Sequence, residues 1–167
     1  MTNTGWLKAE LWIAGIIVVL DQAVKALVRA RLQLHESIDV IPGFFSLTRV
    51  HNYGAAFGLM NAMEFPFKTV LLSIVAAVAL GALSWHGATL PPKQRLARFG
   101  LALIVGGAAG NLIDRLQSGY VVDFVDLYWQ GWHFWAFNVA DAAITVGVSL
   151  MILDLLHIGR RRVSRTV

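Results

Sequence analysis

The chain has 167 residues, enough for one domain, and 57% of them are hydrophobic while only 14% are charged. So low a charged fraction is unusual for a soluble globular protein and indicates a membrane protein. The absence of cysteine excludes a disulfide framework, a thiol nucleophile and a thiolate metal site. The net charge is +4, but the basic residues cluster in two short segments rather than along one stripe. We therefore interpret them as determinants of membrane orientation and expect no nucleic-acid surface.

Four segments are long and apolar enough to cross a membrane, which takes about 20 mostly apolar residues. They cover residues 8–28, 67–85, 96–113 and 139–157. We therefore predict an all-α membrane protein: one domain, residues 1–167, built as a bundle of four transmembrane helices.

The first segment has an alternative interpretation as a cleaved signal peptide, because Lys8 precedes a short apolar core. No good small-x-small cleavage site follows, and Asp21, Gln22 and Lys25 would be unusual there, so we favour a retained helix. Asp21 and Lys25 are four residues apart, share one helix face and can pair. We expect that face to point into the bundle, because an unpaired charge facing lipid is costly.

Basic residues indicate the orientation of the bundle. They lie between the second and third segments and in the tail, at Lys93, Arg95, Arg98, Arg160, Arg161, Arg162 and Arg165. Four helices place these two regions and both termini on one side, which the positive-inside rule makes cytoplasmic. Arg29, Arg31 and Arg49 on the opposite side are exceptions to the pattern.

Two longer segments, residues 29–66 and 114–136, then face outward. Residues 37–50 combine β-branched and aromatic residues with a Pro-Gly break, which predicts short strands. We therefore expect a small β-rich extracytoplasmic platform. The second segment carries an aromatic patch that we interpret as anchors at the membrane surface: Tyr128, Trp129, Trp132, Phe134 and Trp135.

Polar residues gather at one depth near the outer face. Asp21 lies late in an outgoing helix, and Asn111, Asp114 and Arg115 end another. Asp123 is expected in the loop that follows, and Asn138 and Asp141 begin the returning helix. Topology thus brings Asp123 and Asp141 together although they are eighteen residues apart. Helix ends are also where polar residues ordinarily lie, so helix capping is an alternative interpretation.

Small residues mark the third segment. Gly106 and Gly110 form a G-x-x-x-G pair, and Gly107 adds a third small position. Because glycine lets helix backbones approach closely, we interpret all three as packing residues rather than substrate contacts.

Two carboxyl groups at one depth permit water activation. One must be ionised and the other protonated, because two like charges a few ångströms apart cannot both form cheaply. The ionised group takes a proton from water, the other donates to a carbonyl oxygen, and the proton belongs to the pair. Asn111, Asn138 and Arg115 could hold the backbone of an extended peptide.

Signatures of other hydrolase classes do not occur. The zinc signature H-E-x-x-H has only a near miss at residues 35–39, with aspartate in place of the second histidine. The G-x-S-G and G-x-G-D signatures of intramembrane proteases are absent. A serine–lysine dyad stays open, with Lys25, near the outer half of a helix, as its candidate lysine.

The chain resembles the bacterial lipoprotein signal peptidases, the signal peptidase II family. The resemblance is carried by five motifs that occur in order over almost the whole chain. They are Asp21-Gln22 with Lys25, NYGAAF from Asn52, GNLIDR from Gly110, VVDF from Val121 and FNVAD from Phe137.

This resemblance implies an intramembrane aspartyl endopeptidase that removes signal peptides from prolipoproteins by cleaving before the diacylglyceryl-modified cysteine, without a metal or other cofactor. Asp123 and Asp141 match the catalytic pair, and Asp21 and Lys25 match a polar pair that supports the site. The positions matching the substrate cleft are Asn52, Gly54, Asn111, Arg115 and Asn138. The resemblance also implies a monomer in the bacterial inner membrane, in contact with lipid and inhibited by globomycin-type peptides.

Two other functions compete with the peptidase. In a small transporter or proton-conducting protein, Asp21, Lys25, Asp123 and Asp141 would form a relay. The clustering of these residues at one face, rather than across the membrane, disfavours it. In a non-catalytic scaffold, the aspartates would only cap helices. Neither alternative explains the ordered set of motifs.

Overall fold

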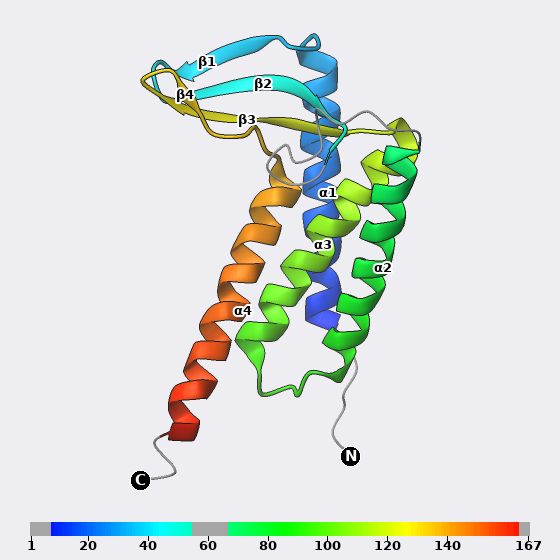
Figure 1. Ribbon diagram of the computed structural model, residues 1–167, viewed down its shortest axis with the longest axis vertical. Helices are drawn as coiled ribbons and strands as arrows, with labels where there is room; N and C mark the ends of the chain where they lie inside the picture. The colour runs from blue at the N-terminus through cyan, green and yellow to red at the C-terminus, as the bar shows by residue number, and fades with distance from the viewer. Residues whose placement is uncertain (1–7, 55–66, 164–167) are drawn as a thin grey trace.

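The molecule is a bundle of helices with a small sheet across one end. A computed structural model describes residues 8–54 and 67–163. Its elements are α1 (Lys8–Arg31), β1 (Ser37–Ile41), β2 (Phe45–Asn52), α2 (Lys68–Thr89), α3 (Arg95–Ser118), β3 (Val121–Trp129), β4 (Trp132–His133) and α4 (Val139–Val163). Figure 1 shows the sheet at one end, and the start of α1, the end of α4 and the α2–α3 connection at the other. The predicted four-helix bundle with a β-rich platform is confirmed.

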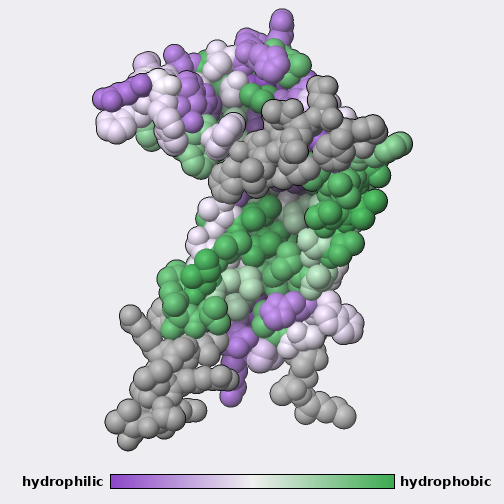
Figure 2. Space-filling view, viewed as in Figure 1, coloured by the Kyte–Doolittle hydropathy of each residue, from purple (hydrophilic) through white to green (hydrophobic). Residues whose placement is uncertain are grey.

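The outer surface of the bundle is apolar. All four helices are long and apolar enough to cross a membrane. Large apolar side chains on the bundle surface are exposed, among them Leu11, Val19, Leu71, Val78 and Leu155. Figure 2 shows this apolar surface over the helices and a more hydrophilic surface over the sheet. An exposed apolar belt of this size fits lipid rather than water.

Helix α3 is the centre of the bundle and packs against the other three helices. Its apolar stretch is 61% buried, against 11–17% for the others. A Cβ atom at Gly106 would lie 2.8 Å from the carbonyl oxygen of Ala14 in α1, and one at Gly107 would overlap that of Ala140 in α4. The predicted packing role of these glycines is confirmed, and it brings the polar residues of three helices close together.

The sheet has the order β1-β2-β3-β4 with antiparallel neighbours. Strands β1 and β2 confirm the strands predicted over residues 37–50. Strand β3 pairs with β2 across a long sequence separation, so that Asn52 lies opposite Val121 and Val50 lies opposite Asp123.

The expectation that Asp123 lies in a loop was wrong, because it lies within β3. The residues around it, Val121 to Phe124, are buried on both faces of the strand. A strand buried on both faces does not show the alternation of apolar and polar residues that identifies a half-buried strand. Asp123, a charged residue within this apolar run, made the strand still harder to recognise from the sequence.

All four helices extend beyond their predicted ends, α2 to Thr89 and α4 to Val163. Helix α1 continues to Arg31, and α3 continues to Ser118, where Gly119 with φ +78° forms the left-handed C-cap. Asp114 and Arg115 lie in the last two turns of α3, as the sequence indicated, but beyond the predicted end of the helix at residue 113. Their charged side chains face the interior of the protein and the sheet, which is why an apolar-run criterion ended the helix too early.

Arg98 is not the loop charge that the sequence indicated. It lies in the first turn of α3, is 1% exposed, and pairs at 2.6 Å with Glu10 of α1. It also donates to the carbonyl oxygen of Leu90. This buried ion pair ties the ends of three helices together, far from the sheet (Figure 1).

The close contact of α3 with α4 generates a stability prediction. A Cβ atom at Gly147 would overlap the carbonyl oxygen of Gly100, whereas one at Gly81 has no atom within 4 Å. We expect Gly147→Ala to destabilise the protein by about 1–3 kcal/mol through overpacking. Gly81→Ala should leave stability unchanged or raise it slightly, because alanine favours helix more than glycine. Thermal unfolding in detergent compares the two, and equal melting temperatures would contradict this packing.

Candidate active site

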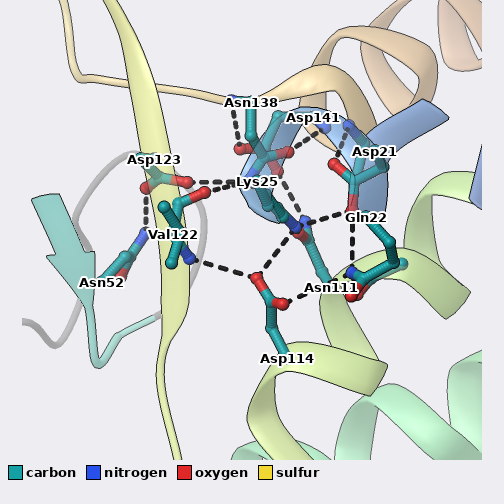
Figure 3. Close-up of polar contacts among 12 residues, drawn as sticks. Asp21, Gln22, Lys25, Asn52, Asn111, Asp114, Val122, Asp123, Asn138 and Asp141 are labelled. Atoms are coloured by element: carbon teal, nitrogen blue, oxygen red, sulfur yellow. Dashed lines mark hydrogen bonds and ion pairs between the residues drawn. The ribbon is translucent and has the colours of Figure 1, made fainter. Parts of the chain in front are cut away.

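Asp123 and Asp141 lie side by side because strand β3 is bonded to the segment that leads into α4. The backbone of Val125 bridges to Phe137, immediately before the helix. Asn138 then connects the two carboxyls (Figure 3). Its Nδ2 donates to Asp123 Oδ1 at 2.7 Å, and its backbone N–H donates to Asp141 Oδ2 at 3.3 Å.

Asn138 and Asp141 also cap α4 together. The backbone N–H of Asp141 donates back to Asn138 Oδ1 at 2.9 Å, which completes a reciprocal capping pair at the helix start. The capping interpretation considered from the sequence is therefore correct for Asp141. The same bonds also fix its carboxyl beside that of Asp123, so capping and site geometry are one arrangement.

Neutral amides hold the outer oxygens of both carboxyls. Asn52 Nδ2 donates to Asp123 Oδ2 at 3.0 Å, and Asn111 Nδ2 donates to Asp141 Oδ1 at 2.8 Å. Amide donors orient a carboxyl group without compensating its charge. Each carboxyl is therefore fixed in direction while the pair keeps its tendency to retain a proton.

Burial changes the acidity of Asp123, whose side chain lies on β3 and is 2% exposed as a residue. Loss of water raises the pKa of its carboxyl to about 7, and the neighbouring Asp141 carboxylate adds to the rise. The hydrogen bonds from Asn52 and Asn138 oppose it but do not cancel it. Near neutral pH the pair can therefore hold one proton, as general acid–base chemistry requires.

A layer of buried charge lies directly beneath the two carboxyls. Lys25 is 0% exposed, and its Nζ lies 2.7 Å from Asp21 Oδ2 and 3.0 Å from Asp114 Oδ2. It also donates to Asn111 Oδ1 at 2.9 Å. The predicted pairing of Asp21 with Lys25, and its inward direction, are confirmed.

Asp114 belongs to this layer, although the sequence placed it only among the polar residues at a helix end. It is 0% exposed and accepts from Lys25, from Arg29 at 2.8 Å and from the backbone N–H of Val122. Its spacing of three residues from Asn111 puts both on one face of α3, which is the signal that could have identified it. Arg29, an exception to the pattern of basic residues in the sequence, is the ion-pair partner of Asp114.

Arg115 and Gly54 meet at the edge of the site. Arg115 Nη2 donates to the carbonyl oxygen of Gly54 at 3.1 Å, and the backbone N–H of Gly54 donates to Asn52 Oδ1 at 2.9 Å. The predicted residues of the substrate cleft therefore surround the two aspartates. Residues 55–57, which complete the NYGAAF motif, lie outside the described residues, as does Arg165.

A cavity of about 570 Å³ adjoins the carboxyls. Asn52, Asn111, Arg115 and Asp141 form its polar end, and Asp123 lies beside it, bonded to Asn52. The remaining wall is mostly apolar and comes from α2, α3, α4 and the segment before α4, including Ala76, Ala108, Ile144, Val146, Phe134 and Trp135. Such a cavity suits an apolar ligand with one polar group to be fixed in place.

Within residues 8–54 and 67–163, no group of three or more histidine, cysteine, aspartate or glutamate side chains is placed to hold a metal ion. The zinc-like sequence at residues 35–39 does not form a helix. His35 has φ 66° in the turn after α1, and β1 begins at Ser37. The two ends of that sequence therefore lack the helical spacing that a zinc signature needs.

Comparison with known proteins places the chain in a family. It matches the model of signal peptidase (SPase) II over residues 13–157. It is 45% identical over 150 residues to a lipoprotein signal peptidase of Geobacter metallireducens, covering 90% of this chain and 91% of the relative. It is 44% identical over 149 residues to one of Symbiobacterium thermophilum, covering 89% and 95%.

Two solved structures have a similar fold. One bacterial membrane enzyme has a TM-score of 0.74 at 31% identity, covering 94% of this chain and 93% of its own. A second has a TM-score of 0.79 at 30% identity, covering 93% and 97%. With its four apolar helices, its antiparallel sheet and its paired aspartates, the chain belongs to the signal peptidase II family.

Proposed function

We propose that this protein is an intramembrane aspartyl endopeptidase that removes signal peptides from prolipoproteins, cleaving before the diacylglyceryl-modified cysteine. The observation that carries this proposal is the pair formed by Asp123 and Asp141 at the polar end of an apolar cavity. Family membership supports it, because members of signal peptidase II process prolipoproteins.

The cavity suits this substrate. A signal peptide is an apolar helix, and the acyl chains of a diacylglyceryl group are apolar as well. Ala76, Ala108 and Ile144 offer a small and apolar wall to such groups, whereas Asn52 and Arg115 offer polar groups at one end. A peptide bond between the signal helix and the lipid-modified cysteine would then lie against Asp141.

The chemistry follows from one proton shared by two carboxyls. The ionised carboxylate takes a proton from a water molecule, whose oxygen attacks the scissile carbonyl carbon. The protonated carboxyl donates to the carbonyl oxygen, which becomes a hydroxyl of the tetrahedral intermediate. Collapse of the intermediate breaks the C–N bond: the protonated carboxyl gives its proton to the amine nitrogen, and one hydroxyl gives its proton to the other carboxylate as the C=O bond re-forms. Asn111 and Asn138 orient the carboxyls, and Arg115 and Gly54 hold the peptide backbone.

We place the protein in the bacterial inner membrane as a multi-pass protein and a monomer, with both termini in the cytoplasm. The α2–α3 connection, which carries basic residues, lies at the same end as the start of α1 and the end of α4 (Figure 1). The positive-inside rule makes that end cytoplasmic, which puts the two aspartates near the outer face. Globomycin-type peptides would occupy the same cavity as the substrate.

Replacing either aspartate tests the proposal. We expect Asp123→Asn and Asp141→Asn each to lower kcat for a diacylglyceryl-modified prolipoprotein by at least about 10³-fold, because general acid–base catalysis is lost. Mass spectrometry of the products, made by purified protein in detergent, gives the rate and the cleavage position. Asparagine has nearly the same shape as aspartate, so both variants should remain folded. Near-normal turnover by either folded variant would refute the assignment.

The raised pKa of Asp123 predicts a pH dependence. The proton of the pair is present below the pKa of about 7 and is lost as the pH rises through it. We therefore expect kcat/KM to fall on the alkaline side with an apparent pKa near 7, and the fall to persist when EDTA is present. A profile of kcat/KM from about pH 5 to 9 measures this. A rate that stays constant up to about pH 9 would contradict the shared proton.

The cavity predicts a difference between two neighbouring alanines of α2. Ala76 lines the cavity, whereas the neighbouring Ala77 is exposed on the surface of the bundle. We expect Ala76→Phe to raise KM for the lipid-modified substrate at least about tenfold, equivalent to about 1.4 kcal/mol, because the phenyl ring fills the cavity. Ala77→Phe adds the same ring toward lipid and should leave KM nearly unchanged. Equal KM values would exclude the cavity as the binding site.

A further inference from the structure

Two buried carboxylates outside the pair each hold one backbone N–H group next to it. Asp21 Oδ1 of α1 accepts from the backbone N–H of Ala140 at 2.9 Å, one residue before Asp141. Asp114 Oδ2 of α3 accepts from the backbone N–H of Val122 at 3.1 Å, one residue before Asp123. The two contacts are equivalent: each fixes the backbone that carries one of the two aspartates.

A single ammonium group joins these two carboxylates. Lys25 Nζ lies 2.7 Å from Asp21 and 3.0 Å from Asp114, and all three side chains are 0% exposed. The same ammonium donates to the oxygen of the Asn111 side chain, whose nitrogen faces Asp141. Figure 3 shows these bonds forming one connected set between α1, α3, β3 and the start of α4.

We propose that Asp21, Lys25 and Asp114 form a spacer triad that sets the distance and relative orientation of the Asp123 and Asp141 carboxyls. The three are positioning residues, because they act through the backbone of Val122 and Ala140 and through Asn111. This inference rests on the proposed function of the aspartate pair.

The connectivity of the chain explains why a spacer is needed. Asp123 is carried by a strand and Asp141 by a helix, and the segment between them forms the β3–β4 hairpin and its exit. Misplacing a reacting group by about 1 Å can reduce a rate about 10²-fold. The spacer triad ties both carriers to the rigid core of the bundle, so their spacing does not depend on that hairpin.

A general need for stability does not explain these contacts. Buried ion pairs contribute little net stability compared with apolar residues of the same volume. The bundle has a second buried pair, Glu10 with Arg98, at the end away from the sheet. That pair ties α1 and α3 to the end of α2, whereas the bonds of the spacer triad reach the two backbones that carry the aspartates.

The first test compares two neutral replacements of Asp114. In Asp114→Asn, the amide oxygen can keep the position of Oδ2 and accept from both Val122 and Lys25. The amide nitrogen then replaces Oδ1, so Gln22 and the partly exposed Arg29 each lose one acceptor, while Gln22 keeps its bonds to Gly110 and Asp21. Asp114→Ala is neutral like Asp114→Asn, but its side chain offers no acceptor to the backbone N–H of Val122.

We expect Asp114→Ala to lower kcat at least about 10²-fold with KM within about threefold, and Asp114→Asn to stay within about tenfold of wild-type kcat. Equal losses in the two variants would show that charge matters rather than position, and would overturn the proposal. Wild-type kcat in both folded variants would overturn it as well.

The second test replaces glycines, so it changes no charge. It can still be carried out if Asp114→Ala does not fold. A Cβ atom at Gly110 would lie 2.6 Å from Asp21 Oδ2, whereas one at Gly106, one turn away, would press on Ala14 and Ile17 of the same helix α1. Gly110→Ala should therefore lower kcat about 10²-fold by moving the carboxylate that holds Ala140. Gly106→Ala should lower the melting temperature while kcat stays within a few-fold. Equal kcat values would contradict the spacer.

A third measurement separates this inference from the proposed function, because it needs no cleavage. The chain contains no cysteine, so Asp123→Cys/Asp141→Cys supplies the only thiol pair. The yield of cross-linking by bifunctional thiol reagents of graded length reports the spacing of the two positions. Adding Gly110→Ala should change the preferred reagent length, and adding Gly106→Ala should not. If the preferred reagent length is unchanged in both glycine variants, the spacer proposal is overturned. This outcome can be read even if the wild-type protein cleaves no prolipoprotein.

Discussion

The interaction on which the rest of the structure depends is the burial of the Lys25 ammonium among oxygen acceptors inside an apolar bundle. Where no water is available, a polar group needs a partner from the protein itself. Lys25 finds three, on Asp21, Asp114 and Asn111. Meeting this requirement draws α1 and α3 together at one depth, and the sheet and α4 are bonded to the same layer.

The close approach of the helices makes this layer possible. Glycines of α3 let α1 and α4 come within backbone contact on two sides. Larger side chains there would separate the helices and leave the polar groups without partners. Between Arg98 and Gly110 the buried face of α3 is apolar, with Leu101, Leu103 and Ile104 in the interior. The buried polar groups at the two ends of α3 are therefore separated by an apolar stretch, which disfavours a proton relay across the membrane.

The lack of water has a different effect on the aspartate pair, because there it raises the pKa of a carboxyl. Its side-chain donors are amides, which orient the carboxyls without adding a positive charge in contact with them. That choice keeps a proton on the pair near neutral pH, whereas a cation in direct contact with the carboxyls would favour its loss. One cluster therefore contains both the ion pairs of Lys25 and, beside them, the aspartate pair that shares a proton.

Much of this arrangement could be predicted from the sequence. Apolar runs identified the four helices, the spacing of Asp21 and Lys25 predicted their pairing, and helix direction brought Asp123 and Asp141 to one end. Other features depend on tertiary contacts that local patterns do not encode. Asp123 proved to lie in a strand because β2, far away in sequence, pairs with it. The burial of Arg98 depends on Glu10, and that of Asp114 on Lys25.

The most direct test of the central claim, a proton shared by two buried carboxyls, is an infrared pH titration of the protein with ¹³C-labelled aspartate. The wild-type spectrum minus that of Asp123→Asn isolates the pair. We predict a protonated carboxyl band that persists at pH 6 and disappears as the pH rises through about 7. A difference spectrum with no protonated carboxyl above about pH 5, where ordinary aspartates are ionised, would show that the pair holds no proton and would contradict the acid–base mechanism.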